Sequence, residues 1–227
     1  MKYQSPALWT PSEIAATDMP EFLEQTPENI AEFTSAEAER RNQIRLADTL
    51  GEKTGWGNKW MHEIQSAPTG EPWHKAFIAA AKIIESNGIL ILHGNRGPGK
   101  TRMAAELAVY QRNTRYTTAM RFFLEIRASF RAGSESSELE IISSLIATDL
   151  LIIDELQERG DTSFEDRLLT HLIDARYAAQ RPTILIANLT KPELSKSLGP
   201  SIVSRLHENG AAIDCYWASF RSQSRGN

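Results

Sequence analysis

"GILILHGNRGPGKTRMAAELAVY", which spans Gly88–Tyr110, joins a short apolar run to an alanine-rich run through a segment dense in glycine. The apolar run predicts a buried strand, and the alanine-rich run predicts a helix. Glycines between the two let the backbone curl so that its N–H groups converge on phosphate oxygens. The segment fits the phosphate-loop pattern G-x-x-x-x-G-K-[ST], whose fixed positions here are Gly94, Gly99, Lys100 and Thr101.

The residue types of this loop suit a nucleoside triphosphate with a bound metal ion. Lys100 is expected to reach the β- and γ-phosphates, and the Thr101 hydroxyl is expected to ligate Mg²⁺. Pro98 has no N–H to donate, but its fixed φ stiffens the loop, and nucleotide binding is expected to survive. We therefore predict ATP and Mg²⁺ as cofactors. The predicted nucleotide-contacting residues are Gly94, Asn95, Arg96, Gly97, Pro98, Gly99, Lys100, Thr101 and Arg102.

A second motif, "LLIIDE" at Leu150–Glu155, places two acids at the end of a hydrophobic strand. Ligands of open parallel sheets bind at the carboxyl ends of the strands, so both acids should face the phosphate loop. Asp154 would then complete the Mg²⁺ site with Thr101, and Glu155 would be the general base for a water molecule. A solvated turn is the commoner fate of an Asp-Glu pair, but here four aliphatic residues precede it. A water-activating glutamate favours an ATPase over a small-molecule kinase.

Strands and helices alternate from residue 73 onward, which indicates an α/β domain with a parallel sheet and helices on both faces. We assign this domain to residues 73–227. Residues 1–72 are predicted to be a helical partner-docking segment and linker, since "TPSE" and "TPEN" each place a threonine cap before a proline. Asn188 ends the predicted strand "TILIAN". It is either a ligand of the γ-phosphate and the attacking water or an ordinary turn residue.

The composition is that of a globular protein, with 41% hydrophobic and 24% charged residues among 227. No apolar run is long enough to span a membrane, and the N-terminus lacks the layout of a secretory signal. The single cysteine, Cys215, excludes an internal disulfide and a cysteine zinc cluster. These features predict a cytoplasmic protein. The tryptophans Trp56, Trp60 and Trp73 belong either to the packing of a small helical layer or to a partner-binding surface.

The motifs resemble, in order and spacing, those of the AAA+ ATPases of the DnaC/IstB group, over about residues 73–223. The resemblance is most specific in "SFRAGSESSELEIISSLIATDLLIIDEL", "RPTILIANLTKPELSKSLGPSIVSRLHENG" and "YWASFRS". It implies a P-loop AAA+ (ASCE) core without the C-terminal helical lid of most AAA+ proteins. It also implies that Asn188 is sensor 1, that Arg205 is the arginine finger for a neighbouring subunit's site, and that Arg221 is sensor 2. Guanidinium groups suit the last two roles because they stabilise charge on a phosphoryl group.

The same resemblance marks the helix around Phe130 and Arg131 as the part that contacts single-stranded DNA. Aromatic rings stack on bases, and basic groups follow the backbone. The alternative is that Phe122, Phe123 and Phe130 belong to the core, which we expect for one or two of them. The net charge of −4 argues against strong non-specific DNA binding, so a local basic face must supply the contact.

Together the motifs and the resemblance predict an ATP-dependent helicase loader that forms a homo-oligomer with ATP at the subunit interfaces. Its expected partners are single-stranded DNA and the replicative DNA helicase, which it delivers during DNA replication. One alternative is an IstB-like transposition ATPase that acts on duplex DNA with a transposase. Another is an adaptor that binds nucleotide without hydrolysing it and in which Glu155 is idle.

Overall fold

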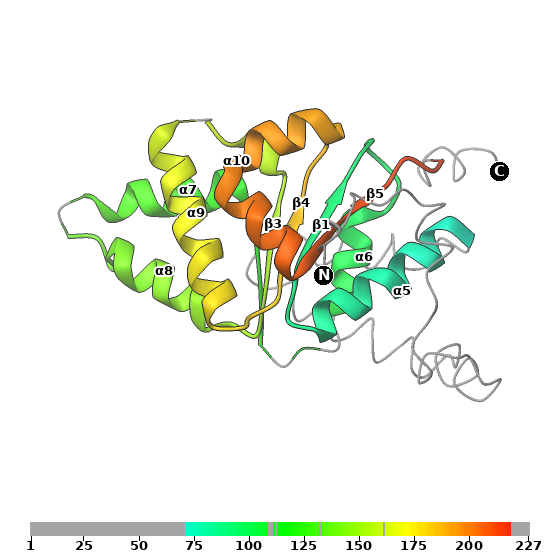
Figure 1. Ribbon diagram of the computed structural model, residues 1–227. Helices are drawn as coiled ribbons and strands as arrows, with labels where there is room; N and C mark the ends of the chain where they lie inside the picture. The colour runs from blue at the N-terminus through cyan, green and yellow to red at the C-terminus, as the bar shows by residue number, and fades with distance from the viewer. Residues whose placement is uncertain (1–70, 109–110, 112, 132, 161, 219–227) are drawn as a thin grey trace, which may run out of the picture.

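The sheet consists of five parallel strands in the order β2-β3-β4-β1-β5. The computed structural model describes residues 71–108, 111, 113–131, 133–160 and 162–218 (Figure 1). Apolar runs form its central strands because a parallel sheet covered on both faces buries every side chain. The strands are β1 (Ile89–His93), β2 (Thr114–Thr118), β3 (Leu150–Asp154), β4 (Thr183–Ile186) and β5 (Gly210–Asp214). The predicted α/β fold with a parallel sheet is confirmed.

Helices cover both faces of this sheet, with α5 and α6 on one face and α7 to α10 on the other (Figure 1). A hydrophobic core lies on each face of the sheet, and successive side chains of β1 point alternately into one and the other. Leu90 and Leu92 pack under α5 and α6, whereas Ile89 and Ile91 pack on the opposite face. The helices are α5 (Glu71–Glu85), α6 (Lys100–Ala108), α7 (Ala119–Ser129), α8 (Glu138–Ala147), α9 (Ser163–Ala178) and α10 (Lys191–Glu208), with a 3₁₀ turn η2 (Leu156–Glu158).

The helix ends follow local sequence signals. Thr118, Ser137 and Thr162 precede α7, α8 and α9, and each side chain accepts a hydrogen bond from a backbone N–H of the first turn. α10 is interrupted at Gly199, whose φ of 72° is non-helical, immediately before Pro200. The stretch therefore consists of two helical halves that meet at a kink.

Packing in the first layer accounts for one of the tryptophans singled out in the sequence. Trp73 on α5 is only 6% exposed, and its ring stacks on Phe77 with 5.5 Å between the centroids. Trp56 and Trp60 lie outside the described residues. The structure thus favours the packing interpretation for Trp73 and does not address the other two.

The division of the chain at residues 72 and 73 stays a prediction, because residues 1–70 are not among those described. Glu71, where α5 begins, is already part of the α/β domain's first helix. In the part of the chain that the structure covers, no helix has the length and apolar character needed to cross a membrane.

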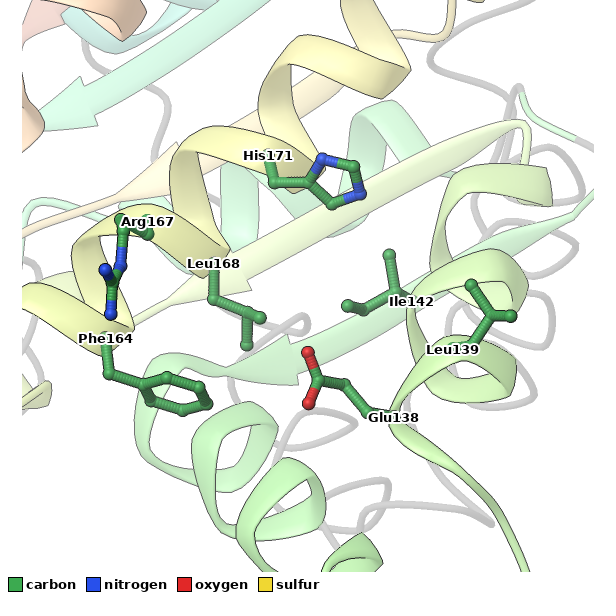
Figure 2. A pocket seen from close by; sticks show the side chains of 7 residues that line it. All are labelled: Glu138, Leu139, Ile142, Phe164, Arg167, Leu168 and His171. Carbon is green, nitrogen blue, oxygen red and sulfur yellow. The ribbon is translucent and has the colours of Figure 1, made fainter.

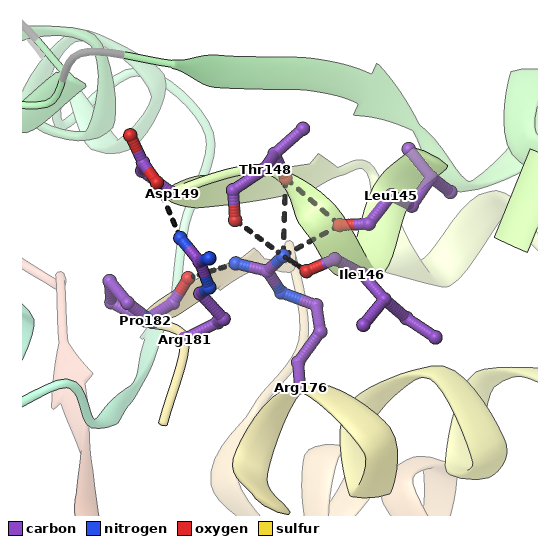
Figure 3. Close-up of polar contacts among 7 residues, drawn as sticks. All are labelled: Leu145, Ile146, Thr148, Asp149, Arg176, Arg181 and Pro182. Carbon is purple, nitrogen blue, oxygen red and sulfur yellow. Dashed lines mark hydrogen bonds and ion pairs between the residues drawn. The ribbon is translucent and has the colours of Figure 1, made fainter. Parts of the chain in front are cut away.

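A buried arginine, Arg176, joins the segments that lead into the amino ends of β3 and β4, and Figure 3 shows its contacts. Arg176 on α9 is fully buried, and its guanidinium donates hydrogen bonds to the carbonyl oxygens of Leu145 at 2.6 Å and Pro182 at 2.6 Å. It also donates to the carbonyl of Thr148 at 3.0 Å and to the hydroxyl of Thr183 at 2.9 Å. Burial lowers the pKa of Arg176 to about 10, which leaves it charged at neutral pH. A positive group here stabilises the carbonyl end of α8.

Replacement of Arg176 by methionine removes these donors and leaves several buried carbonyls without partners. We expect Arg176→Met to lower the free energy of unfolding by about 2–4 kcal/mol, as measured by denaturant titration. Arg181→Met is the matched control. Arg181 pairs with Asp149, and both side chains are more than a third exposed, so its loss should cost less than about 1 kcal/mol. Equal losses in the two variants would contradict the structural role of Arg176.

Candidate nucleotide site

The phosphate loop lies between the carboxyl end of β1 and the first turn of α6, as the sequence predicts. Its backbone uses conformations that favour glycine: φ is 120° at Gly94, 97° at Gly97 and 86° at Gly99. Because α6 begins at Lys100, its N-terminal dipole is directed toward the loop. These features form the curled backbone in front of a helix that phosphate binding requires.

Lys100 lies within the loop and is only 5% exposed. Its Nζ donates hydrogen bonds to the carbonyl oxygens of Gly94 at 3.0 Å and Asn95 at 2.5 Å. The ammonium group is therefore already positioned over the curled backbone. Its contact with β- and γ-phosphates stays a prediction.

A hydrogen bond joins the phosphate loop to the end of β3. Thr101 Oγ1 donates to Asp154 Oδ2 at 2.8 Å, and the Tyr116 hydroxyl donates to the same oxygen at 3.1 Å. The backbone N–H of Glu155 donates to Asp154 Oδ1 at 2.7 Å. Burial raises the pKa of Asp154, and these three hydrogen bonds act in the opposite direction because they stabilise its ionised form. The expectation that Asp154 faces the loop is confirmed.

The oxygen atoms of Thr101 and Asp154 fit the coordination that Mg²⁺ uses with nucleotides. Mg²⁺ in phosphate sites takes one or two protein oxygens and completes its shell with phosphates and water. The described residues contain no group of three or more His, Cys, Asp or Glu side chains that could hold a metal alone. Mg²⁺ binding by Thr101 and Asp154 stays a prediction.

Glu155 turns the chain sharply after β3. Its φ of 54° is in the left-handed region, which is uncommon outside glycine and is found in strained functional turns. Burial raises the pKa of its carboxyl group, and the neighbouring Asp154 and Glu158 add to this effect. A raised pKa increases the proton affinity of a general base. The role of Glu155 as the general base stays a prediction.

Asn188 follows β4 at the same carboxyl edge of the sheet. Its backbone N–H donates to Gln157 Oε1 at 2.9 Å, which ties it to the turn after Glu155. The next residue, Leu189, has its carbonyl oxygen 3.3 Å from Nδ1 of the buried His93. The loop that carries Asn188 is thus held by both neighbouring motifs, and its sensor role stays a prediction.

Two arginines of the predicted nucleotide set form ion pairs within the protein. Arg102 Nε lies 2.6 Å from Glu106 Oε1, one turn along α6. Arg96 is exposed and lies 3.8 Å from Glu158. Neither contact points to a nucleotide, so the inclusion of these two arginines in the site stays a prediction.

Arg205 is bound inside its own protomer. Its Nε lies 2.6 Å from Asp174 Oδ1, and its Nη1 donates to Ser201 Oγ at 2.8 Å. Its guanidinium also lies 5.8 Å from the ring centre of Tyr177. Arg221, the predicted sensor 2, lies outside the described residues. The structure does not bring Arg205 to the phosphate loop of its own chain.

The predicted DNA-contacting residues lie at the far end of α7. Phe130 is 58% exposed and makes an edge contact with Phe164, and Arg131 follows it on the surface. Phe122 and Phe123 are buried, which confirms that two of the three phenylalanines belong to the core. DNA contact by Phe130 and Arg131 stays a prediction.

A cavity of about 520 Å³ opens beside this region, between α8 and α9 (Figure 2). It is distinct from the nucleotide site. Acidic, basic and apolar side chains line it together: Glu138, Leu139, Ile142, Phe164, Arg167, Leu168 and His171.

Two residues near the loop were missed by the sequence analysis. Tyr116 donates to Asp154 from the adjacent strand β2, and the indole N–H of Trp217 donates to the carbonyl of Pro98 at 2.9 Å. Tyr116 lies outside the quoted motifs, whereas Trp217 stands in "YWASFRS" but was given no role there. The one feature of the sequence that could have indicated Tyr116 is its hydroxyl-bearing ring within the strand β2.

Comparison with known proteins gives one family and several relatives. The family described as IstB-like ATP binding protein matches residues 61–225. The replicative helicase loader DnaC of Escherichia coli strain K12 is 28% identical over 141 residues, which are 60% of this chain and 57% of that protein. The DnaC of Buchnera aphidicola subsp. Baizongia pistaciae is 24% identical over 164 residues, or 68% of this chain and 67% of that protein.

Solved structures share the fold. A crystal structure of the DnaC helicase loader superposes with a TM-score of 0.55 at 18% identity, over 66% of this chain and 93% of that one. Domain III of the Thermotoga maritima replication initiation protein DnaA gives a TM-score of 0.57 at 19% identity, over 71% of this chain and 69% of that one. At these identities the likeness shows the fold alone.

Proposed function

The chain belongs to the family of IstB-like ATP binding proteins and has their P-loop AAA+ fold, and from this membership we propose that it is an ATP-dependent helicase loader. The observation that carries the ATPase part is the hydrogen bond between Thr101 and Asp154, which joins the phosphate loop to the acids after β3. The loader part is supported by the relatives named replicative helicase loader. The match spans only 57% of the Escherichia coli relative.

In the proposed site the curled loop binds the phosphates through its N–H groups and through Lys100. Thr101 and Asp154 hold Mg²⁺, which when bound neutralises charge on the phosphates. Tyr116 keeps the Asp154 carboxylate oriented because it donates to the oxygen that Thr101 also contacts. Asp154 is well placed for this role because it is buried yet stabilised as an anion by three donors.

Hydrolysis is assigned to Glu155, which accepts a proton from the attacking water. Its position directly after Asp154, whose side chain contacts Thr101 of the phosphate loop, supports this assignment. Asn188 orients the water or the γ-phosphate, and the contact of its backbone with Gln157 links this loop to the turn that carries the base.

Assembly places Arg205 in the nucleotide site of a neighbouring subunit. Its present contacts with Asp174 and Ser201 must then be exchanged for the γ-phosphate. Arg205 of one subunit binds the nucleotide held by the next subunit, so ATP stabilises the homo-oligomer. Hydrolysis removes the γ-phosphate that Arg205 contacts and so weakens the homo-oligomer. Arg221 is assigned the sensor 2 role on the sequence pattern alone.

Single-stranded DNA is proposed to bind at the end of α7, through Phe130 and Arg131. The exposure of Phe130 supports this assignment, since an exposed ring is available for stacking on a base. Residues 1–72 are proposed to dock the replicative DNA helicase, which the loader delivers in the cytoplasm during DNA replication.

The first test is ATP turnover by the wild type and Glu155→Gln, measured without DNA, with single-stranded DNA and with duplex DNA. We expect single strands to stimulate the wild type, and turnover of Glu155→Gln to fall at least about 100-fold while ATP binding persists. The variant keeps the size of the side chain, so thermal unfolding serves as the control for folding. Stimulation by duplex DNA alone would instead support a transposition ATPase. Undetectable turnover with every DNA would support a nucleotide-gated adaptor.

The second test asks whether Arg205 acts on a neighbouring subunit. Arg205→Ala and Glu155→Gln should each lose turnover by at least about 100-fold, since an arginine finger contributes about 10³–10⁵-fold and a general base about 10²–10⁴-fold. A mixture should regain part of it, because Glu155→Gln subunits supply Arg205 to sites that retain Glu155. Arg205→Ala protomers should still bind ATP. A mixture no more active than its components, or loss of ATP binding, would contradict the assignment.

A further inference from the structure

The segment that follows β5 contacts the phosphate loop at two points, the first of them where the loop begins. The N–H of Cys215 donates to the carbonyl of His93 at 2.7 Å, directly before the loop begins. A Cβ atom on Gly94 would lie only 2.8 Å from the carbonyl oxygen of Cys215, so the two backbones are in close contact. The backbone at Cys215 therefore supports the phosphate loop at its first glycine, Gly94.

A second contact supports the same loop near its other end. The indole N–H of Trp217 donates to the carbonyl oxygen of Pro98 at 2.9 Å. Trp217 is half-buried, and its ring packs against the core beneath α5 and α6. Pro98 itself is buried. The position of its carbonyl is thus determined by a side chain that is anchored in the core.

The peptide bond between Pro98 and Gly99 couples the contact with Trp217 to the orientation of the Gly99 N–H. The bond between Pro98 and Gly99 is trans, so its carbonyl and its N–H point in opposite directions. Because the indole of Trp217 binds the carbonyl of Pro98, the N–H of Gly99 points away from Trp217. This N–H matters more here than in other phosphate loops, because Pro98 has none of its own.

We propose that Trp217 is a positioning residue of the nucleotide site, which orients the Gly99 N–H toward the phosphates through its hydrogen bond to Pro98. This inference rests on the proposed binding of ATP and adds a residue to that site. By linkage, any movement of the segment around Trp217 changes nucleotide affinity, and nucleotide in turn stabilises the segment.

Trp217→Phe tests the proposal because it keeps an aromatic ring and removes only the indole N–H. We expect the dissociation constants of ATP and ADP to rise roughly three- to ten-fold, the effect of one lost hydrogen bond. Both nucleotides should be affected alike, since the loop amides contact the α- and β-phosphates that the two share. Titration calorimetry with the full chain measures both constants.

Trp73→Phe is the matched control. Trp73 lies in the same core, and its indole nitrogen has no hydrogen-bond partner among the described residues. This variant should keep the wild-type affinities, and the two variants should differ little in thermal unfolding. In NMR spectra the indole N–H resonance that Trp217→Phe lacks should shift when ADP is added to the wild type.

The outcomes separate the inference from the proposed function. Wild-type affinity in Trp217→Phe would overturn the positioning role and leave the ATP site intact. Equal losses of affinity in Trp217→Phe and Trp73→Phe would also overturn it, since they would reflect general packing. A wild type that binds neither ATP nor ADP would overturn the proposed function and the inference with it.

Discussion

The hydrogen bond from Thr101 to Asp154 connects the phosphate loop with the acids after β3. It can form only because the sheet holds the carboxyl ends of β1 and β3 close together. Parallel strands bring their carboxyl ends to the same end of the sheet, and in the order β3-β4-β1 only β4 lies between the acids after β3 and the phosphate loop after β1. Buried side chains on both faces of β1 and β3 keep this spacing rigid. The burial that positions Asp154 also raises its pKa, and the three donors around it counteract that effect.

The parts of the site that depend on local chain chemistry could be predicted from the sequence. Glycines that require positive φ, a lysine and threonine at a helix start, and acids directly after an aliphatic strand each have a local physical cause. Their meeting also follows from the sequence, because alternation of strands and helices predicts a parallel sheet. The kink of α10 is of the same kind, since a glycine followed by a proline cannot continue a helix.

The contacts that could not be predicted join residues far apart in the chain. Trp217 reaches Pro98, and Tyr116 reaches Asp154, through packing that no spacing rule expresses. Arg176 was not singled out, because a buried arginine bound by backbone carbonyls looks in sequence like any charged residue on a helix. The ion pair of Arg205 with Asp174 could not be predicted for the same reason. In the single chain, the arginine predicted to act on another subunit is bound by residues of its own chain.

The central claim is that Thr101 and Asp154 together hold a metal with ATP. Its most direct test is calorimetric titration of ATP, with and without Mg²⁺, into the wild type and Asp154→Asn. We expect Mg²⁺ to strengthen ATP binding to the wild type by at least about tenfold and to have little effect on Asp154→Asn, because the amide lacks the negative charge with which a carboxylate attracts Mg²⁺. Binding without Mg²⁺ should be similar in both proteins. An equal gain from Mg²⁺ in the two proteins would contradict the claim.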